Sequence, residues 1–252
     1  SIFKYYDGEI PFYTRVDSVI SWFEFEEKKR PQLILLYFSE PDHSGHEYGV
    51  DKEKMIESVA NMDNLLGYLL QRLKTLDIYP QLNIVITSDH GMTDVSADRL
   101  IILDDYISRM DDLYINGRGS HIQFDHRKGK ADYADVLYHE LKNIPCSQIW
   151  KKSRIPERFH FVNNNTGDYL LLADEGWFIT THSALKENKY TLSGMHGYDP
   201  ALANMHGIFY TMGPQIISGL QIQSFESIHI YPLICELLGI KPYSNINDGP
   251  DG

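Results

Sequence analysis

The stretch "QLILLYFSEPDHSGHEYGVD", residues 32–51, decides the fold, because it joins a continuous apolar run to a cluster of Asp and His. The run 32–38, bounded by two prolines, predicts a buried β-strand. Residues 51–76 predict a helix, because apolar residues recur there at steps of three and four. A second apolar run, 83–88, predicts the next buried strand. This strand–helix–strand order with short links is typical of a parallel α/β sheet.

The rest of the chain continues the alternation of strands and helices. The sequence predicts a helix at 130–143, strands at 168–174 and 207–213, and a terminal helix at 226–240. Residues 109–130 mix Gly, Asp, His and Arg, and we expect an irregular insertion there. The chain has no internal repeat and no linker, so we predict a single domain over residues 1–252.

Composition excludes some classes of partner. The net charge is −12, from 23 basic and 35 acidic residues, which argues against a nucleic-acid polymer as partner. It leaves room for a small phosphate ester, since bound metal ions can invert the local field. No apolar run approaches the roughly 20 residues that span a bilayer.

Side chains that can bind metals follow both apolar runs. Asp42 and His46 come after the first run, and Asp89 and His90 come after the second. Open parallel sheets bind ligands beyond the carboxyl ends of their strands, so the two pairs are expected to meet. A third motif places His196 between glycines. Asp and His are typical ligands of catalytic zinc, and the pattern predicts a centre with two metal ions.

Each pair alone also has a purely structural interpretation. An Asp at a strand end can cap the following turn, so one pair by itself favours neither interpretation. The occurrence at two strand ends favours metal binding. His43 and His206 are expected not to be ligands, because a lone His is more often a surface or core residue.

Three motifs make a family resemblance specific. They are "EPDHSGHEYG" at 40–49, "ITSDHGM" at 86–92 and "GMHGYDPALANMHGIF" at 194–209. They resemble the motifs of the ectonucleotide pyrophosphatase/phosphodiesterase family of the alkaline phosphatase superfamily, particularly its fourth and fifth members. The resemblance covers nearly the whole chain. It implies an alkaline-phosphatase-like α/β fold, a mostly parallel sheet flanked by helices, and an extracellular or cell-surface location.

The resemblance also implies two zinc ions. By motif position, Asp42, His46 and His196 would hold one ion, and Asp89 and His90 would supply half of the second site. The nucleophile of the family is a Thr that precedes the segment represented by this chain, as does another Asp ligand.

None of Thr14, Thr75 and Thr87 lies in the nucleophile motif. The chain therefore resembles the C-terminal two-thirds or so of a catalytic domain. We expect the Thr on a missing N-terminal segment, and any membrane tether would lie outside this chain.

Aromatic residues suggest the substrate. Tyr6 and Tyr37 match family positions that line a nucleobase slot, and stacking there tolerates different bases. As alternatives, Tyr6 is a surface anchor and Tyr37 a core residue at a strand end. The resemblance further implies a Cys146–Cys235 disulfide, and "NNT" from Asn164 fits a glycosylation sequon.

These features predict a zinc-dependent phosphodiesterase or nucleotide pyrophosphatase. Its expected substrates are small nucleotides, such as dinucleoside polyphosphates or NAD-like pyrophosphates. The residues of the motifs at 40–49 and 194–209 favour this activity over that of a phosphomonoesterase or a phosphomutase of the superfamily. Two alternatives remain open, a choline-lipid phosphodiesterase of the same family and a non-catalytic fragment that binds zinc or nucleotide.

Overall fold

A computed structural model describes residues 4–187 and 192–243. These residues cluster into two compact units, each built from separate stretches of the chain. Unit 1 comprises Ser1–Ser39, Val59–Asp89 and Ile208–Gly252, and unit 2 comprises Glu40–Ser58 and His90–Gly207. The single domain expected from the sequence stays a prediction.

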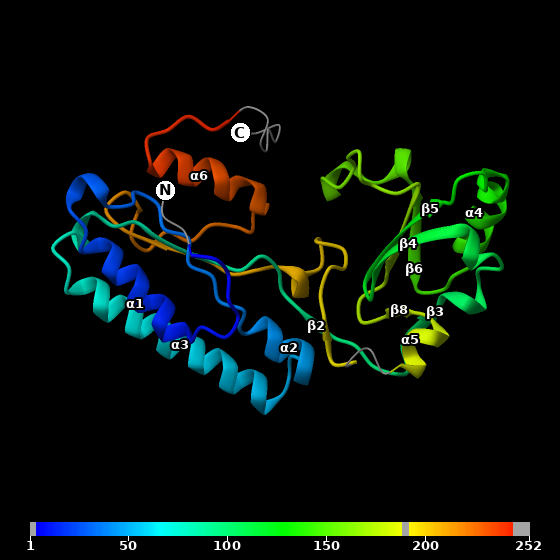
Figure 1. The fold of residues 1–252 in the computed structure, drawn as a ribbon, viewed down its shortest axis with the longest axis horizontal. Coiled ribbons are helices and arrows are strands. Elements are labelled where there is room, and N and C mark those ends of the chain that lie inside the picture. Colours follow the sequence, from blue (N-terminus) through cyan, green and yellow to red (C-terminus); the bar gives the residue numbers. More distant parts are fainter. Residues whose placement is uncertain (1–3, 188–191, 244–252) are drawn as a thin grey trace. The chain divides into compact units, whose positions relative to one another are not determined.

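Unit 1 is built mainly of helices around a pair of strands. Its elements are α1 (Phe12–Phe23), most of α3 (Glu53–Lys74), β1 (Ile84–Thr87), β10 (Phe209–Met212) and α6 (Ile230–Leu237). Helices α1 and α3 lie side by side (Figure 1). Val16 and Ile20, one turn apart on α1, pack with Leu65 and Leu73 of α3 because each helix carries an apolar stripe.

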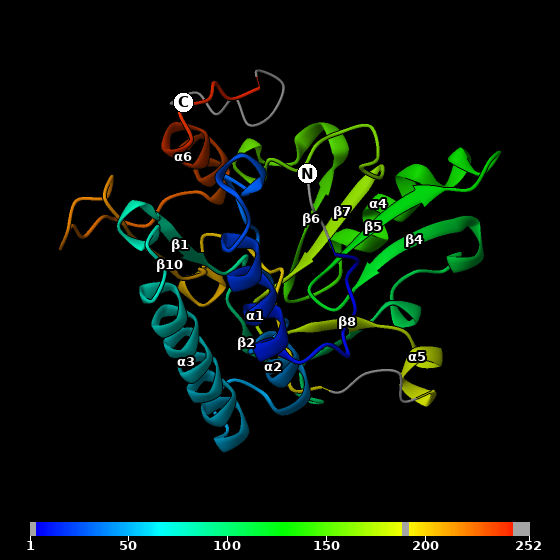
Figure 2. The ribbon, with the colours of Figure 1, turned by 60° about the vertical axis from the view of Figure 1, so that its left-hand side comes forward.

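Unit 2 contains most of the strands. The antiparallel strands β4 (Leu113–Arg118), β5 (His121–His126), β7 (Tyr169–Ala173) and β6 (Ser147–Lys151) form one sheet in that spatial order (Figure 2). The remaining elements are α2 (Asp42–Tyr48), β2 (Thr93–Asp94), β3 (Leu100–Ile102), α4 (Ala134–Lys142), β8 (Phe178–Thr180), α5 (His182–Lys186) and β9 (Gly194–Met195). Strand β3 pairs with β8 in parallel, and β2 pairs with β9 in antiparallel orientation.

The core of unit 2 lies between its sheets and helix α4. Phe124 of β5, Leu171 of β7, Leu137 of α4 and Ile179 of β8 belong to one buried cluster, and each is 0% exposed. Every residue of β7 is buried, since β5 and β6 flank its two edges and β7 residues pack into the core of unit 2.

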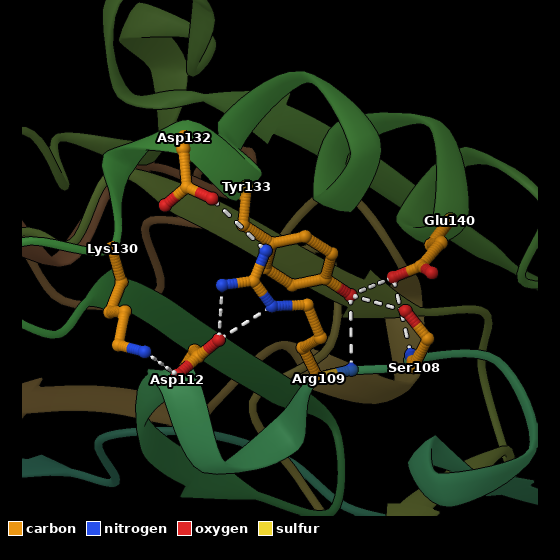
Figure 3. Close-up of polar contacts among 7 residues, drawn as sticks. All are labelled: Ser108, Arg109, Asp112, Lys130, Asp132, Tyr133 and Glu140. Carbon is orange, nitrogen blue, oxygen red and sulfur yellow. Dashed lines mark hydrogen bonds and ion pairs between the residues drawn. The ribbon is translucent and has the colours of Figure 1, made fainter.

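A polar network holds the segment that precedes α4 (Figure 3). The hydroxyl of buried Tyr133 donates a hydrogen bond to Glu140 and accepts one from the backbone N–H of Arg109 at 3.3 Å. The Arg109 guanidinium lies 4.8 Å from the centre of the Tyr133 ring, and its Nε donates to Asp112 at 2.6 Å. Burial raises the pKa of the Tyr133 hydroxyl, so this residue stays a neutral donor.

Most predicted elements are confirmed. The helix expected at 51–76 is α3, and the one at 130–143 is α4. The strands expected at 83–88, 168–174 and 207–213 are β1, β7 and β10, and the terminal helix is α6. The α/β class is confirmed, but among the described strand pairs only β3–β8 is parallel, which corrects the expectation of mostly parallel pairing.

The strand predicted at 32–38 is not formed in the structure. The segment is extended, with alternating burial. Leu33, Leu35 and Tyr37 are exposed, whereas Leu36 and Phe38 pack on the core of unit 1. A strand needs a neighbouring strand that is hydrogen-bonded to it, and no other backbone segment among the described residues pairs with 32–38.

The prediction of an irregular insertion at 109–130 is also wrong, because β4 and β5 form a hairpin there. Two glycines explain the error, since Gly117 and Gly119 have φ of +103° and +73° inside and just after a strand. They permit the turn, and they obscured the alternation of apolar residues on either side.

The structure bears on two predicted features, the disulfide and the glycosylation site. Cys146 and Cys235 are free thiols, and they lie in different units, so the structure does not contain the expected disulfide. Asn164 is exposed, as a glycosylated Asn must be. Within the described residues, no helix combines the length and apolar composition needed to cross a membrane.

Adjacent residues of α4 test where the core lies. We expect Leu137→Ala to lower the free energy of unfolding by about 2–5 kcal/mol, because Leu137 is fully buried. The control is Val136→Ala, at a position that is 51% exposed, with an expected change within about 0.5 kcal/mol. Urea unfolding followed by circular dichroism measures both. Equal losses for the two variants would contradict this assignment of the core.

Candidate metal centre

Helix α2 brings two of the predicted ligands together. Asp42 is its first residue, and His46 follows one turn later, so both side chains lie on the same face. The Nε2 atom of His46 is 3.5 Å from Oδ1 of Asp42. The spacing of the motif therefore produces the expected pair.

Side-chain hydrogen bonds fix both ends of α2. At its N-terminus, the Glu40 carboxylate accepts hydrogen bonds from the Ser44 backbone N–H at 3.1 Å and from the Ser58 hydroxyl at 2.9 Å. Just beyond its C-terminus, Asp94 accepts one from the Val50 N–H at 2.7 Å. A helix of seven residues is too short to persist alone, so these contacts stabilise it.

Glycines let α2 approach β9 closely. A Cβ atom on Gly194 would lie 2.2 Å from the Gly45 carbonyl oxygen, so only glycine fits there. At this contact, Nδ1 of His46 lies 2.9 Å from the Gly194 carbonyl oxygen. A carbonyl can only accept, so Nδ1 carries the proton. The lone pair of Nε2 is then available to a metal ion.

His196 and His90 complete the cluster. His196 follows β9, and its Nε2 lies 3.9 Å from Oδ1 of Asp42. The Nε2 atom of His90 is 3.8 Å from the same oxygen, and its Nδ1 faces the Gly91 carbonyl at 2.8 Å. The rings of His90 and His196 stack at 3.5 Å. Three imidazoles therefore surround one carboxylate oxygen.

The Asp42 oxygen has the environment of a metal ligand. Oδ1 is buried and has no hydrogen-bond partner among the described residues, although the side chain as a whole is 44% exposed. An unsatisfied buried carboxylate oxygen is costly, and a cation would compensate for it. The ligand atoms of Asp42, His46 and His196 all lie within 4.8 Å of one another. This set of donors fits a catalytic zinc ion.

The turn after His196 is anchored by residues that the sequence did not single out. Gly197 has φ of +83°, and a Cβ there would lie 2.8 Å from the hydroxyl of buried Ser120. The Tyr198 hydroxyl donates to the Trp177 carbonyl at 2.8 Å, and burial raises its pKa. The turn is thus fixed by residues of two other segments.

An ion pair continues this anchoring. Arg158 donates through both terminal nitrogens to the two oxygens of Asp199, and this interaction lowers the pKa of the Asp199 carboxyl. Asp199 thus pairs with arginine, although it lies in the same motif as His196. The sequence alone does not indicate that Arg158 is the partner of the Asp199 carboxylate.

Other predicted residues lie as follows. His43 is exposed, with its Nε2 3.7 Å from Glu47 on the same helix, and His206 is exposed as well. Neither belongs to the cluster of potential ligands. Asp89 and His90 lie on either side of the boundary between the units, so their role as a joint ligand pair stays a prediction.

The two tyrosines of the expected nucleotide slot both lie in unit 1. Tyr6 and Tyr37 are 67% and 61% exposed. Their ring centres are 6.0 Å apart, with an angle of 61° between the planes. Exposed faces of two neighbouring aromatic rings are suitable for stacking on a planar ligand.

Comparison with known proteins identifies the family. Residues 1–199 match the family described as type I phosphodiesterase / nucleotide pyrophosphatase. The chain belongs to this phosphodiesterase family. The resemblance noted in the motifs is therefore confirmed.

The similar members of the family are longer than this chain. Human bis(5′-adenosyl)-triphosphatase ENPP4 is 37% identical over 252 residues, covering 97% of the chain and 52% of that protein. Human family member 5 is 37% identical over 237 residues, covering 93% and 48%. The venom phosphodiesterase CdcPDE of Crotalus durissus collilineatus is 34% identical, and the match covers 30% of its length. The chain thus spans about half the length of the two human relatives.

Solved structures confirm the fold. Human ENPP5 matches with a TM-score of 0.87 and 36% identity, over 95% of this chain and 62% of that one. Murine ENPP5, as an inactive threonine-to-alanine variant in complex with AMP, matches with a TM-score of 0.85 and 34% identity, over 94% and 61%. The alkaline-phosphatase-like α/β fold is therefore shared with these phosphodiesterases.

Substitution of single histidines tests which side chains bind zinc. We expect His46→Ala and His196→Ala to weaken zinc binding by about 100-fold or more, because each removes a ligand. His43→Ala is the control, since His43 is exposed on the same helix and outside the cluster. Zinc affinity of the full-length protein is measured by competition with a chromogenic chelator. Unchanged affinity in His46→Ala or His196→Ala would remove that residue from the site.

Proposed function

We propose that the full-length protein is a zinc-dependent phosphodiesterase or nucleotide pyrophosphatase. It would cleave pyrophosphate or phosphodiester bonds of small nucleotides. One observation carries the proposal, the buried Asp42 oxygen that lacks a hydrogen bond and faces the Nε2 atoms of three histidines. The membership of the chain in a phosphodiesterase family connects this cluster with phosphoryl chemistry.

We assign Asp42, His46 and His196 to one zinc ion, and Asp89 and His90 to part of a second site. Zinc supplies Lewis-acid stabilisation of negative charge on phosphoryl oxygens and lowers the pKa of a coordinated water. The Asp42 carboxylate contributes negative charge at the centre of the cluster. The Gly194 carbonyl holds the proton of His46 on Nδ1, which orients Nε2 toward the site.

The nucleophile is proposed to be a threonine outside residues 1–252. Inactivity of the murine ENPP5 threonine-to-alanine variant supports a threonine in this role. The hydroxyls of Thr75 and Thr87 donate to backbone carbonyls, at 2.7 Å to Arg72 and 3.1 Å to Ser88. Their hydroxyl protons are used locally, which argues against either as the attacking group.

The proposal of a nucleotide substrate rests on Tyr6 and Tyr37. Their neighbouring exposed rings would stack on a nucleobase. A relative named for bis(5′-adenosyl)-triphosphate hydrolysis and an ENPP5 structure with AMP support a dinucleoside polyphosphate or an NAD-like pyrophosphate. The net charge of −12 argues against a nucleic-acid polymer.

The expected setting is extracellular or at the cell surface, with Asn164 glycosylated. Relatives named as venom enzymes and ectoenzymes support this location. Any membrane tether would lie outside this chain.

Replacing one tyrosine tests the nucleotide substrate. In the full-length protein, we expect Tyr6→Ala to weaken AMP binding roughly 5- to 150-fold, since stacking on one base contributes about 1–3 kcal/mol. Tyr5→Ala, at the adjacent exposed position, serves as the control and should leave the affinity within about twofold. Isothermal titration calorimetry gives both affinities.

The same preparations distinguish the remaining alternatives. Hydrolysis of diadenosine triphosphate should be much faster than hydrolysis of a phosphocholine ester. The reverse order would establish the choline-lipid alternative. Absence of turnover by the zinc-loaded full-length protein would leave a binding module.

A further inference from the structure

Arg15, on the first turn of α1, connects the loop before that helix with the extended segment after it. Its Nε donates a hydrogen bond to the Ile10 carbonyl at 3.1 Å. One terminal nitrogen, Nη2, donates to the carbonyls of Asp7 at 3.0 Å and Gly8 at 3.4 Å. The other, Nη1, donates to the Tyr37 carbonyl at 3.1 Å. One guanidinium therefore fixes two stretches of backbone that lie far apart in the sequence.

Arg15 also contacts aromatic rings around the proposed slot. The guanidinium carbon lies 5.5 Å from the centre of the Tyr6 ring and 5.0 Å from that of Phe12. The Phe12 ring packs against Phe38 at 5.1 Å, next to Tyr37 in the chain. Arg15 thus holds Tyr6 through its ring and Tyr37 through its backbone.

Only arginine can make this set of contacts. Its planar guanidinium carries five N–H donors in a fixed fork and also binds to aromatic faces. A lysine ammonium is a point charge that cannot reach carbonyls on both sides at once. Within residues 4–187 and 192–243, the Arg15 guanidinium contacts backbone carbonyls and aromatic rings and forms no ion pair with a carboxylate.

Exposed rings need such support. Tyr6 and Tyr37 are more than half exposed, so little packing restricts them. A ligand that had to order both rings would lose affinity, whereas a preorganised pair avoids that loss. We propose that Arg15 is a positioning residue that preorganises the Tyr6–Tyr37 pair for a nucleobase. This inference rests on the proposed nucleotide substrate.

The test compares Arg15→Lys with Arg30→Lys in the full-length protein. Arg30 is the matched control, because it also lies in unit 1 and donates to a backbone carbonyl, that of Phe25 at 3.3 Å. We expect Arg15→Lys to raise the Kd for AMP and the KM for diadenosine triphosphate about threefold to tenfold. The value of kcat and the affinity for inorganic phosphate should stay within about twofold. Arg30→Lys should change none of these.

A double-mutant cycle separates positioning from a general structural role. If Arg15 acts through Tyr6, adding Arg15→Lys to Tyr6→Ala should weaken AMP binding by less than Arg15→Lys does in the wild type. Fully additive losses, or an equal loss of affinity for AMP and inorganic phosphate, would overturn the positioning role.

The outcomes for the two proposals differ. If Tyr6→Ala weakens AMP binding while Arg15→Lys leaves it unchanged, the inference is wrong and the nucleotide substrate stands. If Tyr6→Ala itself has no effect, the proposed slot is wrong.

Discussion

The hydrogen bond from Nδ1 of His46 to the Gly194 carbonyl joins two segments that are 148 residues apart in the chain. It does two things at once. It holds α2 against β9, where the absence of side chains at Gly45 and Gly194 permits close approach. It also sets the tautomer of His46, so that Nε2 faces Asp42 and His196. Contacts at both ends of α2 and around the turn after His196 keep these two segments in place.

The sequence predicted the centre of this arrangement but not its support. Asp42 and His46 could be predicted as ligands from the Asp and His that follow the apolar run 32–38, but the helix α2 that carries them was not predicted. His196 could be predicted from its glycine neighbours and its motif. Glu40 and Asp94 could not, since their role depends on contacts with residues 18 and 44 positions away. Such contacts leave no periodic signal in the sequence.

The errors in the fold have a similar origin. Residues 32–38 have the composition of a buried strand, and the burial of their side chains alternates as in a strand. A strand is defined by its neighbour, however, and composition does not supply one. The hairpin of β4 and β5 had the opposite problem. Its apolar residues alternate, at Ile122 and Phe124 for example, but glycines and charged residues suggested an irregular segment.

The most direct test of the central claim is zinc K-edge X-ray absorption spectroscopy of the full-length, zinc-loaded protein. It reports the atoms bound to the metal and does not depend on substrate or turnover. The account predicts nitrogen and oxygen ligands at about 2.0–2.2 Å, with the outer-shell scattering of imidazole rings. Sulfur ligands at about 2.3 Å, or a spectrum without imidazole scattering, would contradict it.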